Sequence, residues 1–240
     1  MQWCRYKTGG SINYGIIDED IVTAVEGSPF GKYTKTSNSQ PLSSVKLLAP
    51  VIPPTFYAAG INFREHVTEM AQKRGEEPQF PPAADVGYRA VNAIIADGED
   101  IVVPKDATEL VQYEGELVVV FGKECRKVSE KDALDYVLGY TIGNDVSERT
   151  WQRKDKTFWR SKGSDTFAPV GPWIETDVDP QNLEILVRLN GEEVQRAHTK
   201  DMLFTFSEII SYISQQVTLH PGDLVFSGTT GVTRAMKPGN

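Results

Sequence analysis

The chain is poor in the residues that build disulfide frameworks and zinc sites. It has 240 residues but only two cysteines and three histidines, and neither Cys4 nor Cys125 lies in a CxxC pattern or a Cys/His cluster. Two such cysteines are too few for a disulfide framework. The sequence also argues against zinc, which prefers nitrogen and sulfur ligands.

Long apolar runs and an excess of positive charge are also missing. No apolar segment approaches the length of a membrane span, and the first residues, MQWCRYKTGG, contain no signal-peptide core. Lysine and arginine number 25 against 33 aspartates and glutamates, which gives a net charge of −8. Nucleic-acid binders usually carry a basic face. We therefore expect a soluble cytoplasmic protein that binds neither membranes nor nucleic acids.

Enough apolar sequence is present for a packed core. Hydrophobic residues make up 40% of the chain, which suits one large domain or one domain with a small appendage. Residues 1–50 are predicted to form a small β-rich region, because YGIIDEDIVTAV is typical of two short strands around an acidic turn. The polar stretch 37–44 is interpreted as a loop, and residues 51–240 as the main domain.

Strand signals outnumber helix signals in the main domain. Asn190-Gly191 between alternating segments is a strong hairpin signal, and residues 223–228 predict another strand. One helix is predicted over residues 131–138, capped by Ser129 and ended at Gly139. These signals favour a β-rich α+β fold over a doubly wound sheet.

A second helix has the clearest start signal in the sequence. Thr205 followed by Glu208 is a capping-box pattern. After it, Ile209, Ile210 and Ile213 form an apolar stripe with helical spacing.

Three acidic residues form the most informative pattern. Glu114 and Glu116 open the apolar run 117–121, and side chains two residues apart in a strand share one face. Two carboxylates held that close favour a cation between them. With Asp145 as a third ligand they would form an oxygen site suited to Mg²⁺, Mn²⁺ or Ca²⁺. The alternative is a pair of solvent-facing charges before a buried strand.

Three further patterns could contribute to chemistry. His66 and Glu69 lie one helical turn apart, so the carboxylate could orient the imidazole as a general base, or the two could be an ordinary surface pair. Lys162 follows a basic cluster that suggests an anionic substrate, although solvated charges would give the same pattern. The turn SGTTG, residues 227–231, offers N–H and hydroxyl donors for an oxyanion. It lacks the GK[ST] ending of a P-loop.

Taken in order, six motifs over residues 55–240 resemble the fumarylacetoacetate hydrolase family. They are YAAGINFREHVTEM, YEGELVVVFGK, GYTIGNDVSERTWQ, WRSKGSDTFAPVGPW, LNGEEVQRAHTKDM and LHPGDLVFSGTTGV. The resemblance implies a mixed β-roll, a homodimer, and a small variable N-terminal region before the catalytic domain. It also implies that the stretch 67–84 is a mobile lid over the site.

The same resemblance assigns roles to individual residues. Glu114, Glu116 and Asp145 would ligate Mg²⁺ or Mn²⁺, and His66 with Glu69 would activate water or move a proton. Lys162 would stabilise negative charge on the substrate. Contacts to the substrate would come from a further group of residues: Arg89, Arg149, Gln152 and Thr229.

Some positions depart from the family pattern. Arg89 stands where a lysine is common, Tyr113 where a histidine is common, and Thr230 where proline is usual. The sequence also stops at PGN, where relatives usually continue with a further strand. Truncation or an unusual end are the two interpretations, and loss of that strand would expose a sheet edge.

The implied reaction is metal-dependent hydrolysis of a carbon–carbon bond in a 1,3-dicarbonyl organic acid, such as an acylpyruvate or fumarylpyruvate. This activity is typical of the catabolism of aromatic compounds. The alternatives on the same site are decarboxylation of an oxaloacetate-like acid and isomerisation of a 2-hydroxy-diene-dioate. A metal-binding domain without turnover is a further alternative.

Overall fold

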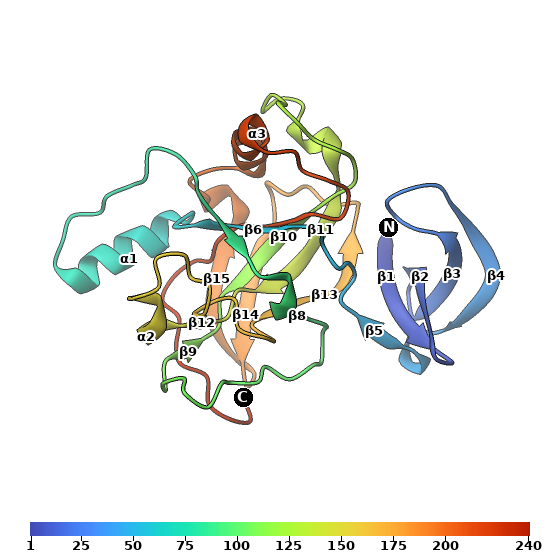
Figure 1. The fold of residues 1–240 in the computed structure, drawn as a ribbon, viewed down its shortest axis with the longest axis horizontal. Helices are drawn as coiled ribbons and strands as arrows, with labels where there is room; N and C mark the ends of the chain where they lie inside the picture. Colours follow the sequence, from blue (N-terminus) through green and yellow to red (C-terminus); the bar gives the residue numbers. More distant parts are fainter.

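The computed structural model of the protein describes residues 1–240, which form sixteen β-strands and three α-helices (Figure 1). The helices are α1 (Arg64–Arg74), α2 (Arg149–Gln152) and α3 (Phe206–Gln216). The strands are β1 (Gln2–Thr8), β2 (Ser11–Asp18), β3 (Ile21–Gly27), β4 (Tyr33–Pro41), β5 (Lys46–Leu48), β6 (Phe56–Gly60), β7 (Asp85–Arg89), β8 (Ile94–Ile95), β9 (Val111–Gln112), β10 (Gly115–Phe121), β11 (Val137–Asn144), β12 (Ser147–Glu148), β13 (Ala168–Glu175), β14 (Glu184–Leu189), β15 (Glu192–His198) and β16 (Leu224–Phe226).

Twelve of the strands belong to one mixed sheet. Its main order is β4-β3-β2-β1-β13-β11-β10-β16-β6-β7, with β5 paired to β1 and β8 paired to β13. The pairs β16·β6 and β13·β8 are parallel and the others are antiparallel. Two small sheets, β9·β12 and β14·β15, complete the structure. The predicted β-rich α+β fold with an N-terminal β region is therefore confirmed.

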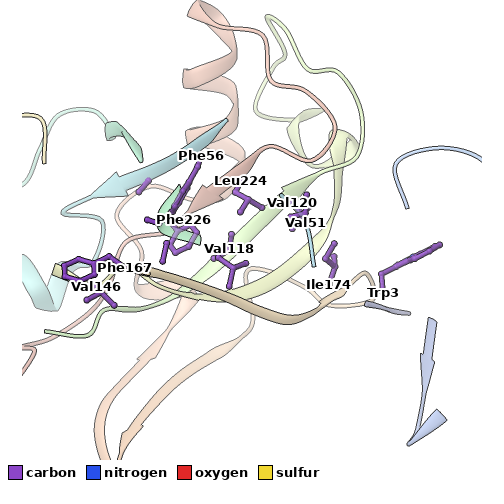
Figure 2. Packing of buried hydrophobic residues seen from close by; sticks show 14 of the residues in the cluster. Trp3, Val51, Phe56, Val118, Val120, Val146, Phe167, Ile174, Leu224 and Phe226 are labelled. Atoms are coloured by element: carbon purple, nitrogen blue, oxygen red, sulfur yellow. The ribbon is translucent and has the colours of Figure 1, made fainter. Parts of the chain in front are cut away.

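The N-terminal strands continue the main sheet. Figure 1 shows β1–β4 at the opposite end of the molecule from α1. Strand β1 pairs with β13, with Trp3 opposite Ile174. The Trp3 side chain is buried in the main core (Figure 2), so both parts share one hydrophobic cluster. The division into separate regions at residue 50 stays a prediction.

Strand β10 is buried on both faces, which explains its uninterrupted apolar sequence. Val118 and Val120 point into a core with Phe56 and Phe226 from neighbouring strands (Figure 2). Val119 and Phe121 point to the other face, where α3 covers the sheet with an apolar stripe. Because β10 is clamped from both sides, the carboxylates at its start have a rigid support.

Two local predictions from the sequence are confirmed. Thr205 Oγ1 accepts a hydrogen bond from the Glu208 backbone N at 3.3 Å, and Glu208 Oε2 accepts one from the Thr205 N at 2.6 Å, which completes the capping box of α3. Asn190 and Gly191 join β14 to β15 with φ of 53° and 83°, as a tight hairpin turn requires.

The helix predicted over residues 131–138 is wrong. Ser129 Oγ donates to the side chain of Asp132 at 2.7 Å and caps no helix, and only a 3₁₀ turn forms at Ala133–Tyr136. Strand β11 begins at Val137 because its backbone pairs with β10. Gly139 lies inside that strand, where a Cβ would be 2.5 Å from the Glu175 carbonyl oxygen. The lack of a side chain at Gly139 allows the strands to pack closely, and this glycine does not terminate a helix.

The polar stretch 37–44 is likewise not a simple loop. Residues up to Pro41 belong to β4, which pairs with β3 at the edge of the sheet. An exposed edge strand needs no alternating apolar pattern, because its backbone pairing alone holds it to its neighbour. Among the three helices, none has both the length and the apolar content needed to cross a bilayer.

Candidate metal and acid–base site

The β10–β11 hairpin brings the three predicted metal ligands together. Gly115 lies opposite Asn144, so Glu114 and Asp145 meet where the two strands begin and end. The Asp145 backbone N donates to the Glu114 carbonyl oxygen at 2.9 Å. Carboxylate oxygens of Glu114, Glu116 and Asp145 lie within 4.8 Å of one another, and all three side chains are buried. The solvent-facing alternative for this acidic pair is therefore wrong.

Three cationic side chains bond two of these carboxylates. Lys162 Nζ donates to Glu114 Oε2 at 2.5 Å and to Asp145 Oδ2 at 2.7 Å. Arg89 donates to Asp145 three times: Nε to Oδ1 at 3.1 Å and to Oδ2 at 3.2 Å, and Nη2 to Oδ2 at 3.0 Å. Arg149 Nη2 lies 2.6 Å from Glu114 Oε1. None of the three bonds Glu116.

This uneven pairing separates the acidities of the three carboxyls. Burial alone would raise the pKa of Asp145, but the charges of Arg89 and Lys162 outweigh it and lower that pKa to about 2. Burial also opposes ionisation of Glu114, yet its cationic neighbours lower its pKa. The pKa of Glu116 lies well above its ordinary value because of burial and the nearby charges of Asp145 and Glu114.

The donor set fits a divalent cation. Three buried carboxylates are the hard oxygen ligands that Mg²⁺ and Mn²⁺ prefer, and Ca²⁺ is compatible with them. Glu116 is a buried carboxylate with no cationic side chain bonded to it, and a bound dication would favour its ionised form. We therefore describe Glu114, Glu116 and Asp145 as a candidate divalent-metal site.

A turn formed by residues 228–231, here called the β16 turn, lies against these carboxylates. The Gly228 backbone N donates to Glu116 Oε2 at 2.7 Å, and Thr229 Oγ1 donates to the Gly115 carbonyl oxygen at 3.1 Å. Gln195 from β15 donates to Thr229 Oγ1 at 3.0 Å and also bonds the Thr230 carbonyl oxygen. The turn is therefore fixed to the carboxylate side of the site.

His66 approaches the other side of the β16 turn from α1. Its Nδ1 lies 2.7 Å from the Gly231 carbonyl oxygen. Because a carbonyl only accepts hydrogen bonds, Nδ1 carries a proton, and in the tautomer that this bond selects Nε2 is the acceptor. The structure thus gives the orienting role, which the sequence assigned to Glu69, to Gly231. Glu69 lies beside Gly231 with a buried Oε2 that has no hydrogen-bond partner.

Arg149 belongs to a network that the sequence did not reveal. Its Nε donates to Gln112 Oε1 at 2.7 Å, its Nη1 to Gln152 Oε1 at 2.8 Å and its Nη2 to Thr233 Oγ1 at 2.8 Å. With the ion pair to Glu114, most of its five N–H groups have partners inside the protein. Gln112 could have been found from the sequence, since it lies two residues before Glu114 and so shares its face.

The four residues predicted to contact substrate all have partners within the protein. Arg89 bonds Asp145, Arg149 bonds Glu114, Gln152 accepts from Arg149 and Thr229 bonds Gly115. Arg89, Arg149 and Thr229 adjoin the carboxylate cluster directly, and Gln152 is linked to it through Arg149. Their contacts to a substrate stay predictions.

Comparison with known proteins places this chain in a family. The family model described as fumarylacetoacetate (FAA) hydrolase, C-terminal, matches residues 55–240, and the one described as Rv2993c-like, N-terminal, matches residues 1–50. The chain therefore belongs to the fumarylacetoacetate hydrolase family, and the resemblance found in its motifs is confirmed.

Relatives with different activities resemble the chain. It is 42% identical over 212 residues to a fumarylacetoacetate hydrolase domain-containing protein 2 homolog of Dictyostelium discoideum, covering 82% of this chain and 67% of that one. It is 35% identical to the 2,4-didehydro-3-deoxy-L-rhamnonate hydrolase of a Sphingomonas strain, covering 99% and 87%. The crystal structure of 5-carboxymethyl-2-hydroxymuconate delta-isomerase from Mycobacterium smegmatis superimposes with a TM-score of 0.89 at 35% identity, covering 98% and 91%.

Proposed function

We propose that the protein is a divalent-metal-dependent hydrolase that cleaves a carbon–carbon bond in a 1,3-dicarbonyl organic acid of the acylpyruvate type. One observation carries the proposal. The β16 turn joins a buried cluster of three carboxylates on one side to His66, with its Nε2 left as acceptor, on the other. A site for a cation and a base beside it are the two parts that such a hydrolysis needs.

The chain's own residues would divide the work. A bound Mg²⁺ or Mn²⁺ would polarise the two substrate oxygens of the dicarbonyl unit. Lys162 uses two of its three N–H groups on Glu114 and Asp145, which leaves one for a substrate oxygen that gains negative charge. His66 Nε2 would take a proton from the water that attacks the carbonyl carbon, and would return it to the neighbouring carbon once the bond between the two carbons breaks. Glu69 Oε2, which lacks a partner, would hold that water or its proton.

Substrate recognition follows from the charge of the site. Arg89 and Arg149 surround the carboxylates and favour an anionic oxo-acid. Gln152 directs its Oε1 at Arg149, so its amide N–H groups remain for substrate oxygens. The stretch 67–84 would act as a lid that excludes water from the site. The homodimer implied by the resemblance is part of the proposal.

Isomerisation is the second candidate. It is favoured by the likeness to the M. smegmatis structure named as a delta-isomerase, which covers almost the whole chain. In that case His66 would move a proton between substrate atoms and no water would attack. Decarboxylation of an oxaloacetate-like acid would need the carboxylate site but no water attack either.

Turnover of acetylpyruvate, fumarylpyruvate and oxaloacetate with Mg²⁺ or Mn²⁺, with and without chelator, tests the proposal. We expect cleavage of an acylpyruvate that stops when the chelator is added and returns with metal. Carbon dioxide release from oxaloacetate alone would replace the hydrolase with a decarboxylase. Conversion of a 2-hydroxy-diene-dioate without cleavage would replace it with an isomerase. Tight metal binding with no turnover of any substrate would indicate a non-catalytic domain.

A further inference from the structure

Helix α1, which carries His66, has little apolar anchoring of its own. Of its eleven residues only Val67 and Ala71 are buried, and both have small side chains. Its N-cap residue, Phe63, offers no side-chain oxygen to the first helical N–H groups. A buried valine and a buried alanine contribute less to the docking of a helix than the broad apolar face of α3 does. Polar contacts are therefore expected to add to what holds α1 on the site.

The start of the helix is tied down by Asn62. Its side chain donates to the carbonyl oxygens of Phe204 at 3.1 Å and Ser227 at 2.8 Å, and it accepts from the Phe204 N at 2.8 Å. Asn62 is itself buried. This anchor fixes the point at which the chain enters α1, but it precedes the helix, and its hydrogen bonds involve none of the helical residues themselves.

Two consecutive residues of α1 meet two consecutive residues of the β16 turn. Thr230 Oγ1 donates to Glu65 Oε2 at 3.0 Å, and His66 Nδ1 donates to the Gly231 carbonyl oxygen at 2.7 Å. Thr230 is buried, with 3% exposure, whereas Glu65 is exposed. A hydroxyl that bonds an ionised carboxylate makes one of the stronger kinds of hydrogen bond.

We propose that Thr230 and Glu65 form a latch that holds α1 on the site before any substrate binds. Both are positioning residues, since neither is placed against the reacting atoms. The latch acts through the β16 turn, which Glu116, Gly115 and Gln195 hold rigidly on the carboxylate side. It keeps His66 in a fixed position relative to the carboxylates, so the substrate does not have to order the helix. The importance of that position for catalysis rests on the proposed function, whereas the latch itself does not.

The test uses amide hydrogen exchange of the whole protein, without metal or substrate. Thr230→Val removes the hydroxyl and keeps the shape of the side chain. We expect amide exchange across residues 67–74 to become about threefold to tenfold faster, because α1 loses the free energy that one hydrogen bond contributes to its docking. Exchange in α3 should stay unchanged. Thr230→Ser should restore slow exchange, since it returns the hydroxyl.

A matched control lies on the helix itself. Thr68 Oγ1 donates to the Arg64 carbonyl oxygen within α1 at 2.9 Å, so Thr68→Val removes a hydroxyl that makes no contact with the turn. We expect this control to leave exchange unchanged. Glu65→Ala should reproduce the effect of Thr230→Val, and the double variant should add nothing, because either change removes the same bond.

For any substrate that the protein converts, steady-state kinetics provide a second measurement. A helix that is docked only part of the time lowers the fraction of competent protein, so Thr230→Val should raise KM several-fold with little change in kcat. Unchanged α1 exchange in Thr230→Val, with α3 exchange intact, would overturn the latch. Absence of turnover in the parent protein would overturn the proposed function and leave the exchange result standing.

Discussion

Helices α1 and α3 have the same length but are held to the rest of the protein in different ways. Each has eleven residues. Helix α3 has a complete capping box and buries Phe206, Ile209, Ile210 and Ile213 against the sheet. Helix α1 has no side-chain cap, buries only two small residues and lies on the β16 turn through hydrogen bonds. Figure 1 shows α1 at the margin of the molecule.

This difference in anchoring gives the two helices different roles, one in stability and the other in function. A helix with a broad apolar face is fixed by the hydrophobic core, and its position does not depend on single hydrogen bonds. A helix with few buried contacts can open at low cost, which is typical of elements that cover a binding site. The fold is therefore expected to depend on α3 and the reaction on α1. The following changes test that division, beginning with the largest expected effect.

Replacing the base on α1 should lower activity strongly and leave the fold intact. His66→Gln retains an N–H donor for the Gly231 carbonyl but removes the basic nitrogen. We expect kcat to fall by about 100- to 10,000-fold, the usual contribution of general acid–base catalysis. The unfolding free energy should change by less than about 1 kcal/mol.

Steady-state kinetics, urea unfolding and calorimetric Mn²⁺ titration of His66→Gln measure these quantities. Metal affinity should stay within about twofold, because the predicted ligands are all carboxylates. A variant that keeps turnover within threefold of the parent would contradict the assignment of His66 as the base.

Truncating the core face of α3 should have the reverse effect. Ile210 is fully buried, so Ile210→Ala should lower the unfolding free energy by about 2–5 kcal/mol through lost burial and a residual cavity. Activity per folded molecule should be unchanged. Tyr212→Ala, at a position 52% exposed on the same helix, is the control and should cost less than about 1 kcal/mol. If Ile210→Ala lowered kcat at full folding, the two helices would not be independent.

The smallest expected effect is a contrast between two buried aspartates. Asp223 follows α3 and accepts hydrogen bonds from the backbone N of Thr55 and of His220, both at 2.7 Å. Burial raises its pKa above the ordinary 3.8. Its contribution to stability is therefore fully present below pH 3.8 and is lost as the pH rises through the folded-state pKa. The contribution of Asp145, whose pKa is about 2, depends on pH in the opposite direction. It is present above pH 3.8 and is lost as the pH falls toward 2.

Asp223→Asn tests the direction in which the stability contribution of Asp223 changes with pH. The unfolding free energy of the parent minus that of the variant should decrease as the pH rises above 3.8, measured by urea unfolding with chelator present. A difference that grows over this range would mean that Asp223 is stabilised as a carboxylate, as Asp145 is.

Short-range patterns in the sequence determined several elements of this protein. The capping box of Thr205, the apolar run of β10 and the Asn190-Gly191 turn each involve residues within a few positions of one another, so their physical causes are visible in the sequence. The same holds for the shared face of Glu114 and Glu116. Two of the motifs that carry the family resemblance, YEGELVVVFGK and LNGEEVQRAHTKDM, lie on β10 and on the Asn190-Gly191 hairpin, and all six are visible as short stretches of sequence.

Tertiary structure decided what depends on distant partners. Residues 131–138 have helix signals but become a 3₁₀ turn and the start of β11, because pairing with β10 outweighs a local preference. Gly231 orients His66 and Thr230 holds Glu65 across 165 positions of sequence. Whether a buried carboxyl is strongly acidic, as in Asp145, or weakly acidic, as in Glu116, depends on which cations reach it. Composition and spacing fix which residues are available, whereas charge pairing and hydrogen bonding are set only by distances in the folded chain.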